Sequence, residues 1–212
     1  MTHQKGGLKP AVASLGLKKA RPARYLAIHE AGHALAHWWN GQPIEYAAAF
    51  AVPTADPEFQ RLIMGGVVGQ SFVLSAPEDC VELSDLVGRD MLVSIAGPAA
   101  QAKYGRYSLD RVLCAGGRSD EQAAFDFLGC LQGDDEDDDA DWMAPFRLTV
   151  ARSRELVRRY WPAIEALADL LQERGRVNGE EIEALFRTVT GESPTLRGNP
   201  LADLDKRGAR HA

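Results

Sequence analysis

The chain has 212 residues, of which 45% are hydrophobic and 25% are charged, and its formal net charge is −6. These proportions are typical of a globular domain and exclude a fully disordered chain. Because no run of about 18 apolar residues and no apolar leader segment is present, we expect one folded domain in the cytoplasm, without a membrane span.

Both ends of the chain and one internal segment have compositions that do not favour packing. No acidic residue precedes Glu30, whereas six lysines and arginines do, so residues 1–21 predict a flexible basic arm. An arm of this kind is suited to an acidic partner, an acidic membrane surface, nucleic acid or organelle targeting. The acidic net charge argues against nucleic acid. The segment "GDDEDDDAD", residues 133–141, predicts a solvated loop, and residues 191–212 predict a flexible tail.

The cysteines form no recognisable pattern. Cys80, Cys114 and Cys130 are odd in number and widely spaced, without a C-x-x-C pair. This spacing argues against a disulfide framework and against a cysteine zinc site, so we expect reduced and mostly buried thiols.

The first strong helical pattern covers residues 22–39, where alanine and leucine dominate. Pro22 suits a first helical turn, and "NGQP", residues 40–43, ends the helix. Residues 44–77 then combine short apolar runs with interspersed Gly and Pro. They predict a small element of short strands beside the helix.

Helical spacing returns in residues 80–105, up to an interruption at Gly97-Pro98. The interruption predicts either two helices or one kinked helix. Ser119, with Gln122 three residues later, has the spacing of a capping box and predicts a helix from Asp120 onward.

The last third of the domain reads as a long helix followed by a short one. Residues 146–173 predict one amphipathic helix, in which Pro162 is a point of kinking. Gly175 ends it, and Asn178 is the expected N-cap of the closing helix. The sequence therefore predicts a mainly α domain over residues 22–190, with a small β element.

One motif in the first helix has the spacing of a metal site. His29 and His33 are four residues apart, so their imidazoles project from one face of the helix about one turn apart, as two ligands of one zinc ion do. Glu30 lies beside them. In H-E-x-x-H metallohydrolases such a glutamate does not bind the metal but takes a proton from the attacking water and delivers it to the leaving nitrogen. The alternative is a core helix whose histidines are hydrogen-bonded to their neighbours.

The motif does not supply a third ligand. His37 continues the spacing, but ligands at positions 29, 33 and 37 span about 12 Å along a straight helix and cannot reach one ion. We therefore interpret His37 as a surface residue or as one that hydrogen-bonds behind the ligands. The acidic candidates elsewhere are Glu45, Glu58, Glu78, Asp79, Glu82, Asp85 and Asp120.

Four segments in this order resemble the peptidase domain of the FtsH-type zinc metalloproteases: "HEAGHA" (29–34), "VVGQSFVLSAPED" (67–79), "IAGPAAQAKYG" (95–105) and "GGRSDEQAA" (116–124). The resemblance covers about residues 22–190 and includes the closing helices. It implies a zincin-like helical fold and zinc held by the two motif histidines and by an aspartate at the start of a later helix. That aspartate corresponds to Asp120.

The chain departs from the family in three respects. It has no G-x-x-x-x-G-K-[ST] phosphate loop and no ATPase module, so we do not expect it to drive unfolding by itself. Gln101 stands where the family usually has glutamate, and Pro98 where it usually has arginine. If that glutamate orients a metal-binding histidine, Gln101 can still do so by hydrogen bonding, without the charge. The alternative is that Gln101 is simply a tolerated helix residue.

Together these features predict a zinc-dependent endopeptidase that acts on flexible or unfolded polypeptides without ATP, with Glu30 as catalytic base and zinc on His29, His33 and Asp120. The alternative is a catalytically silent, metal-stabilised module of the same fold that binds a partner protein. A separate unfoldase or adaptor and a homo-oligomer are both compatible with the sequence, and nucleic acid is not an expected partner.

Overall fold

A computed structural model of the protein describes residues 24–53, 61–75, 83–115, 117–131 and 141–193. The basic arm, nearly all of the acidic segment, Cys80 and residues 194–212 lie outside this part, so what the sequence predicts for them stays a prediction. Among the described residues, no helix combines the length and the apolar character needed to cross a membrane.

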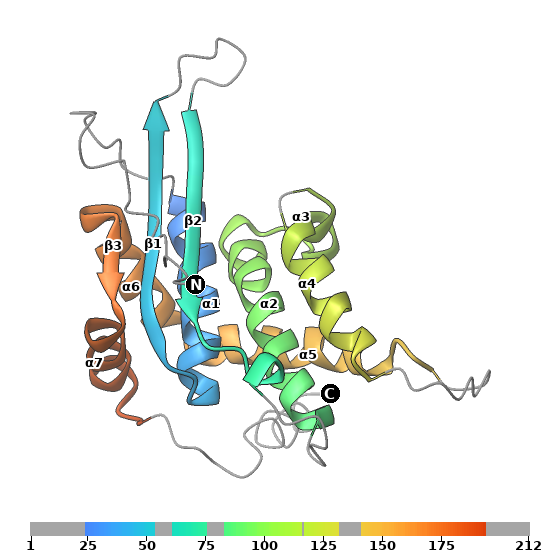
Figure 1. The fold of residues 1–212 in the computed structure, drawn as a ribbon. Helices are drawn as coiled ribbons and strands as arrows, with labels where there is room; N and C mark the ends of the chain where they lie inside the picture. Colours follow the sequence, from blue (N-terminus) through green and yellow to red (C-terminus); the bar gives the residue numbers. More distant parts are fainter. Residues whose placement is uncertain (1–23, 54–60, 76–82, 116, 132–140, 194–212) are drawn as a thin grey trace, which may run out of the picture.

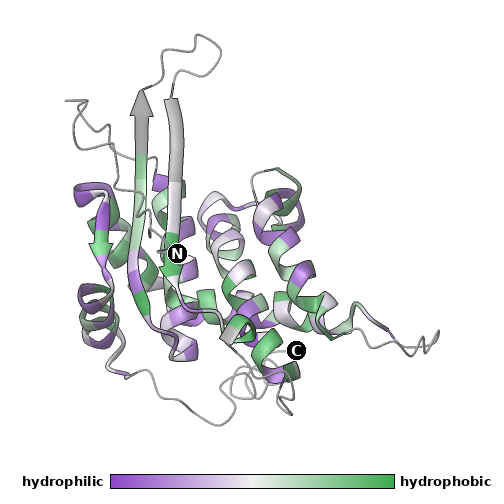
Figure 2. Cartoon of the chain, viewed as in Figure 1, coloured by the Kyte–Doolittle hydropathy of each residue, from purple (hydrophilic) through white to green (hydrophobic). Residues whose placement is uncertain are grey.

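The described chain is mainly helical and has one small sheet, as the sequence predicted (Figure 1). In chain order the elements are α1 (Arg24–Asn40), β1 (Ile44–Pro53), β2 (Arg61–Gly69), the 3-10 turn η2 (Val73–Ser75), α2 (Leu83–Gly105), α3 (Leu109–Ala115), α4 (Arg118–Gly129), α5 (Ala144–Arg159), α6 (Trp161–Arg174), β3 (Arg176–Asn178) and α7 (Gly179–Thr190). Figure 2 shows hydrophilic and hydrophobic residues together on α4 and α7, as expected for helices at a surface.

Helix α1 lies at the centre of the fold. Most of its residues are buried, because it packs against α2 and α6 and also against β1 and β2. Gly32 brings α1 close to α2, since a Cβ at this position would lie 2.6 Å from the Ala96 carbonyl oxygen. The helix ends at Gly41, whose φ of 74° lets the Gln42 amide donate to the His37 carbonyl at 2.9 Å.

The sheet has the strand order β2-β1-β3 with antiparallel pairing throughout, so β2 is an edge strand. Strands β1 and β2 form a hairpin in which Ala47 pairs with Val67, and on the other side Ala47 pairs with Val177 of β3. The hairpin strands are longer than the sequence suggested, and the three-residue β3 was not predicted.

Two helix predictions need correction. Helix α2 is continuous through Pro98, so of the two alternatives the pair of separate helices is wrong. Pro98 is buried and packs near Gly117 at the start of α4, where a Cβ on Gly117 would lie 3.2 Å from the Pro98 ring. The expected single helix over residues 146–173 is also wrong, because it is divided at Tyr160 into α5 and α6.

The division at Tyr160 has a local and a tertiary cause. Pro162 lies in the first turn of α6, where its missing N–H costs no hydrogen bond but where it cannot continue the ladder of α5. Tyr160 is buried, and its hydroxyl donates to the Glu192 carboxylate at 2.7 Å. The chain thus turns at a residue that also anchors the segment after α7.

Two helix ends agree with the sequence and one does not. Asn178 caps α7 by accepting from the Glu181 amide at 2.9 Å, and Gly175 ends α6 in the left-handed conformation, as predicted. The predicted Ser119 cap is wrong, because α4 begins at Arg118 after Gly117 and has no side-chain cap.

Cys114 and Cys130 are free, but both are exposed, which contradicts the expectation of buried thiols.

A buried carboxylate holds the segment after β2 against α2. Asp90 is 3% exposed and accepts hydrogen bonds from Gln42 Nε2 (2.6 Å) and Ser71 Oγ (2.6 Å). It also accepts from the backbone amides of Phe72 (3.2 Å) and Val73 (2.9 Å). One side chain of α2 therefore joins the end of α1 to the chain that leaves β2.

We predict that Asp90→Ala lowers the free energy of unfolding by about 3 kcal/mol, because it leaves several buried donors without an acceptor. Denaturant titration of the purified chain measures this. The control Asp110→Ala, at an exposed carboxylate in the first turn of α3, should cost less than about 1 kcal/mol. Equal losses in the two variants would show that Asp90 does not have this role.

Candidate metal centre

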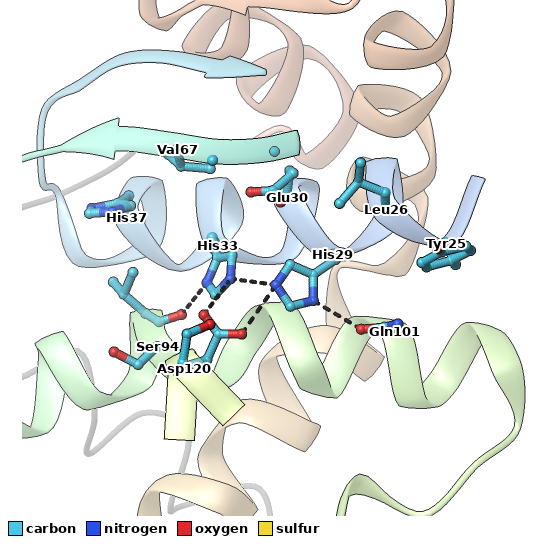
Figure 3. A pocket seen from close by; sticks show the side chains of 14 residues that line it. Tyr25, Leu26, His29, Glu30, His33, His37, Val67, Ser94, Gln101 and Asp120 are labelled. Carbon is cyan, nitrogen blue, oxygen red and sulfur yellow. Dashed lines mark hydrogen bonds and ion pairs between the residues drawn. The ribbon is translucent and has the colours of Figure 1, made fainter. Parts of the chain in front are cut away.

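The motif residues of α1 face two different neighbours (Figure 3). His29 and His33 point toward Asp120, which is in the first turn of α4, and toward α2. Glu30 lies on the side of β2, where a Cβ on Gly65 would be 2.2 Å from its carboxylate oxygen. The helix therefore presents His29 and His33 toward Asp120 and the Glu30 carboxylate toward β2.

Three side chains from α1 and α4 meet at one point. The Nε2 atoms of His29 and His33 are 3.0 Å apart, and they lie 3.3 and 3.5 Å from the two carboxylate oxygens of Asp120. Ligand atoms about 2.1 Å from one zinc ion at tetrahedral angles are about 3.4 Å apart. The observed spacing therefore fits one zinc ion, and within the described residues this is the His/Cys/Asp/Glu group of three that could hold a metal.

Hydrogen bonds behind the histidines favour the same conclusion. Nδ1 of His29 lies 3.0 Å from Gln101 Oε1, and Nδ1 of His33 lies 2.7 Å from the Val93 carbonyl oxygen. Both oxygens only accept, so each Nδ1 must carry the proton and donate. In the neutral form of each ring, Nε2 then keeps the lone pair that faces Asp120, which is the arrangement a metal ion requires.

The charges at this point are strongly coupled. Burial acts to raise the pKa of Asp120, but the hydrogen bonds and charges of His29 and His33 outweigh it and hold that pKa well below its usual range. Burial acts to lower the pKa of His33, yet the Asp120 hydrogen bond and charge raise it above its ordinary value. The cluster thus attracts positive charge, which a proton supplies in the chain by itself and a divalent ion can replace.

Glu30 has the environment of a proton acceptor. Its side chain is buried under β2, and burial raises its pKa, although the charges of His33 and His29 oppose the effect. Gly65 makes this burial possible, because any larger residue would collide with the carboxylate. A carboxylate with a raised pKa takes up a proton more readily near neutral pH than an exposed one does.

An open pocket of about 550 Å³ gives access to the cluster. Tyr25 and Leu26 of α1 line one end, and Val67 of β2 and Ser94 of α2 line the other. Val93 of α2 also lines the pocket. Apart from Glu30 and the ligand cluster, the described residues that line it carry no charge at neutral pH. Among these residues the charge of the pocket is therefore concentrated at Glu30 and the cluster.

The sequence identified part of this arrangement. It singled out His29, Glu30 and His33 from their spacing, and the resemblance added Asp120; the structure brings these residues together. Of the other candidates for the third ligand, Glu45 is exposed on β1 and Asp85 pairs with Arg89 at 2.6 Å, so neither reaches the cluster. Glu58, Glu78, Asp79 and Glu82 lie outside the described residues.

His37 is not the surface residue that the sequence allowed. It is 8% exposed and lies between α1 and β2, where a Cβ on Gly69 would be 2.7 Å from its ring. Burial lowers its pKa to about 4, so the ring is neutral at neutral pH. It lines the pocket, but the ligand cluster does not include it.

Sequence reasoning missed three glycines that shape the site. Gly65 and Gly69 let β2 approach Glu30 and His37, and Gly97 leaves room for the His33 ring. Glycine within a strand is a known sign of close approach, so the glycines of "MGGVVG" could have been read in this way.

Comparison with known protein families and with curated proteins found no match to this chain. The resemblance to FtsH-type peptidases therefore remains a hypothesis, which rests on the residues quoted above.

We predict that Asp120→Ala reduces zinc affinity at least 100-fold, because it removes one of three protein ligands. Titration with zinc in competition with a chelator measures the affinity. Asp126→Ala, at an exposed carboxylate of the same helix, should leave it unchanged. Unchanged zinc binding together with a small loss of stability in Asp120→Ala would mean that Asp120 only complements the helix dipole.

A second prediction concerns Gly97. A Cβ there would lie 2.3 Å from His33 Nε2, so Gly97→Ala should displace the ring and weaken zinc binding at least 10-fold. Alanine favours a helix interior over glycine by about 1 kcal/mol, so helix content should not fall. Gly129→Ala is the control, since a Cβ there meets nothing within 4 Å. Parent-like zinc affinity in Gly97→Ala would contradict the tight fit of His33 against α2.

Proposed function

We propose that the chain is a zinc-dependent endopeptidase. The observation that carries the proposal is the meeting of His29, His33 and Asp120, with the buried Glu30 on the same helix and in the same pocket. Two histidines and one carboxylate leave a coordination position open, which is typical of catalytic rather than structural zinc sites. The quoted resemblance to FtsH-type peptidases supports the same reaction.

Each residue has a distinct part in the proposed reaction. Zinc, when bound, supplies a Lewis acid that acidifies water and polarises a peptide carbonyl. Glu30 accepts the proton of the attacking water and passes it to the leaving nitrogen, and its raised pKa suits both steps. Gln101 and the Val93 carbonyl keep the two imidazoles in one tautomer during these transfers.

The substrate is proposed to be an extended polypeptide. Strand β2 is an edge strand, and its residues Gly65, Gly66 and Val67 line the pocket, so an extended segment can pair with its backbone next to the cluster. Figure 1 shows β2 on the side of the sheet that faces α2 and α4. A folded protein offers few such segments, and unfolding one costs about 5 to 15 kcal/mol.

No nucleotide site is proposed to meet that cost, because the sequence contains no G-x-x-x-x-G-K-[ST] loop. The proposed activity is therefore confined to flexible or unfolded polypeptides unless a separate unfoldase or adaptor delivers them.

We predict that Glu30→Gln retains zinc and loses at least about 100-fold of the hydrolysis rate on a casein-like disordered substrate, because an amide cannot accept the proton of water. Glu165→Gln, at an exposed glutamate of α6, should keep full activity. Equal hydrolysis by parent and Glu30→Gln would place the chemistry elsewhere. ATP should not change the rate, and a stable folded protein should resist cleavage with or without it.

One outcome favours the second candidate function. If the parent chain binds zinc but cleaves no flexible substrate, the metal serves the fold, and the pocket beside β2 becomes the candidate site for holding a partner segment.

A further inference from the structure

The two histidines of the cluster are held from behind in different ways. His33 is fixed by a backbone oxygen of α2, the Val93 carbonyl, which no substitution removes. His29 is fixed by a side chain, the Gln101 amide, at 3.0 Å. On its Nδ1 side, the hydrogen bonding of His29 therefore depends on a single replaceable group.

Both oxygens are uncharged. A carboxylate often accepts the outer N–H of a metal-binding histidine, and its negative charge makes the imidazole a stronger donor to the metal. Here a divalent ion, two neutral imidazoles and the Asp120 carboxylate sum to one positive charge. Besides Asp120, the acidic residue among the described residues that line the pocket is Glu30. It lies on the β2 side of α1, away from Gln101 (Figure 3).

Gln101 is well placed to control this charge. It lines the pocket from α2, four residues beyond Gly97, and its side chain is only partly buried. A glutamate has nearly the same shape and can accept the same hydrogen bond from Nδ1, so the charge can be changed without repacking.

We propose that Gln101 is a positioning residue that holds His29 in its metal-binding tautomer through an uncharged acceptor. The centre therefore binds zinc more weakly, and exchanges it more readily, than it would with a carboxylate at this position. The inference rests on the metal-binding part of the proposed function and not on peptide hydrolysis. Weaker binding makes the zinc occupancy of the centre more sensitive to the free zinc concentration.

The test is the zinc affinity of the purified full chain and three variants, measured by chelator competition at one pH. Gln101→Glu should bind zinc about 10-fold more tightly, because it keeps the hydrogen bond and adds a charge. Gln101→Leu should bind it at least 10-fold more weakly, because the hydrogen bond is lost. Gln122→Leu, at an exposed glutamine of α4 whose side chain donates to Asp126, should stay within about 2-fold of the parent.

Two further readouts separate this role from a merely structural one. The melting temperatures of the metal-free Gln101→Glu and parent chains should agree within a few degrees, and their cobalt-substituted forms should share one absorption spectrum, as expected for the same three ligands. Equal zinc affinities in the parent and both Gln101 variants would overturn the inference. So would a changed cobalt spectrum in Gln101→Glu, because it would mean that residue 101 itself binds the metal.

These measurements, together with the hydrolysis assay of the parent chain, distinguish the two proposals. The expected order of affinities without hydrolysis of any peptide would support the role of Gln101 and refute the peptidase. Zinc-dependent hydrolysis with equal affinities would do the reverse.

Discussion

The close approach of α1 to α2 is the constraint on which the metal centre depends. Gly32 on α1 meets the Ala96 carbonyl, and Gly97 on α2 meets the His33 ring, with no space for a Cβ at either position. Only at this distance can the Val93 carbonyl and the Gln101 amide reach the outer nitrogens of His33 and His29. The ligand geometry is thus a consequence of helix packing, since small residues at a crossing let two backbones come together.

The sheet covers the side of α1 that carries Glu30 and His37. Gly65 and Gly69 allow β2 to lie directly over Glu30 and His37, and the burial that results raises the pKa of Glu30 and lowers that of His37. The Asp90 network holds the chain that follows β2, so it also supports this cover. One helix therefore carries both the histidines that face Asp120 and the covered Glu30 that suits proton transfer, and these residues line one pocket.

Three local signals in the sequence, Pro98, Pro162 and Ser119, do not determine the helix ends, because packing between distant elements also acts on them. Pro98 and Pro162 are similar signals in the sequence, yet α2 continues through the first while a helix begins at the second. Pro98 is buried in a helix that packs against α1, α4 and α5, whereas the break before Pro162 allows Tyr160 to reach Glu192. Ser119 has the spacing of an N-cap, but α4 already begins at Arg118, so Ser119 and Asp120 both lie in its first turn, and Asp120 lies beside His29.

The sequence by itself determined the mainly helical class and the pairing of His29 with His33, because helical spacing places residues four apart on one face whatever surrounds them. It also determined the Asn178 cap and the Gly175 stop, which depend on local backbone chemistry. It did not select a third ligand from spacing, since Asp120 is 87 residues from His33 and the resemblance alone pointed to it. Tertiary structure decided that Asp120, and not Glu45 or Asp85, reaches the histidines, because only the packing of α4 and α2 around α1 determines which distant carboxylate lies beside them.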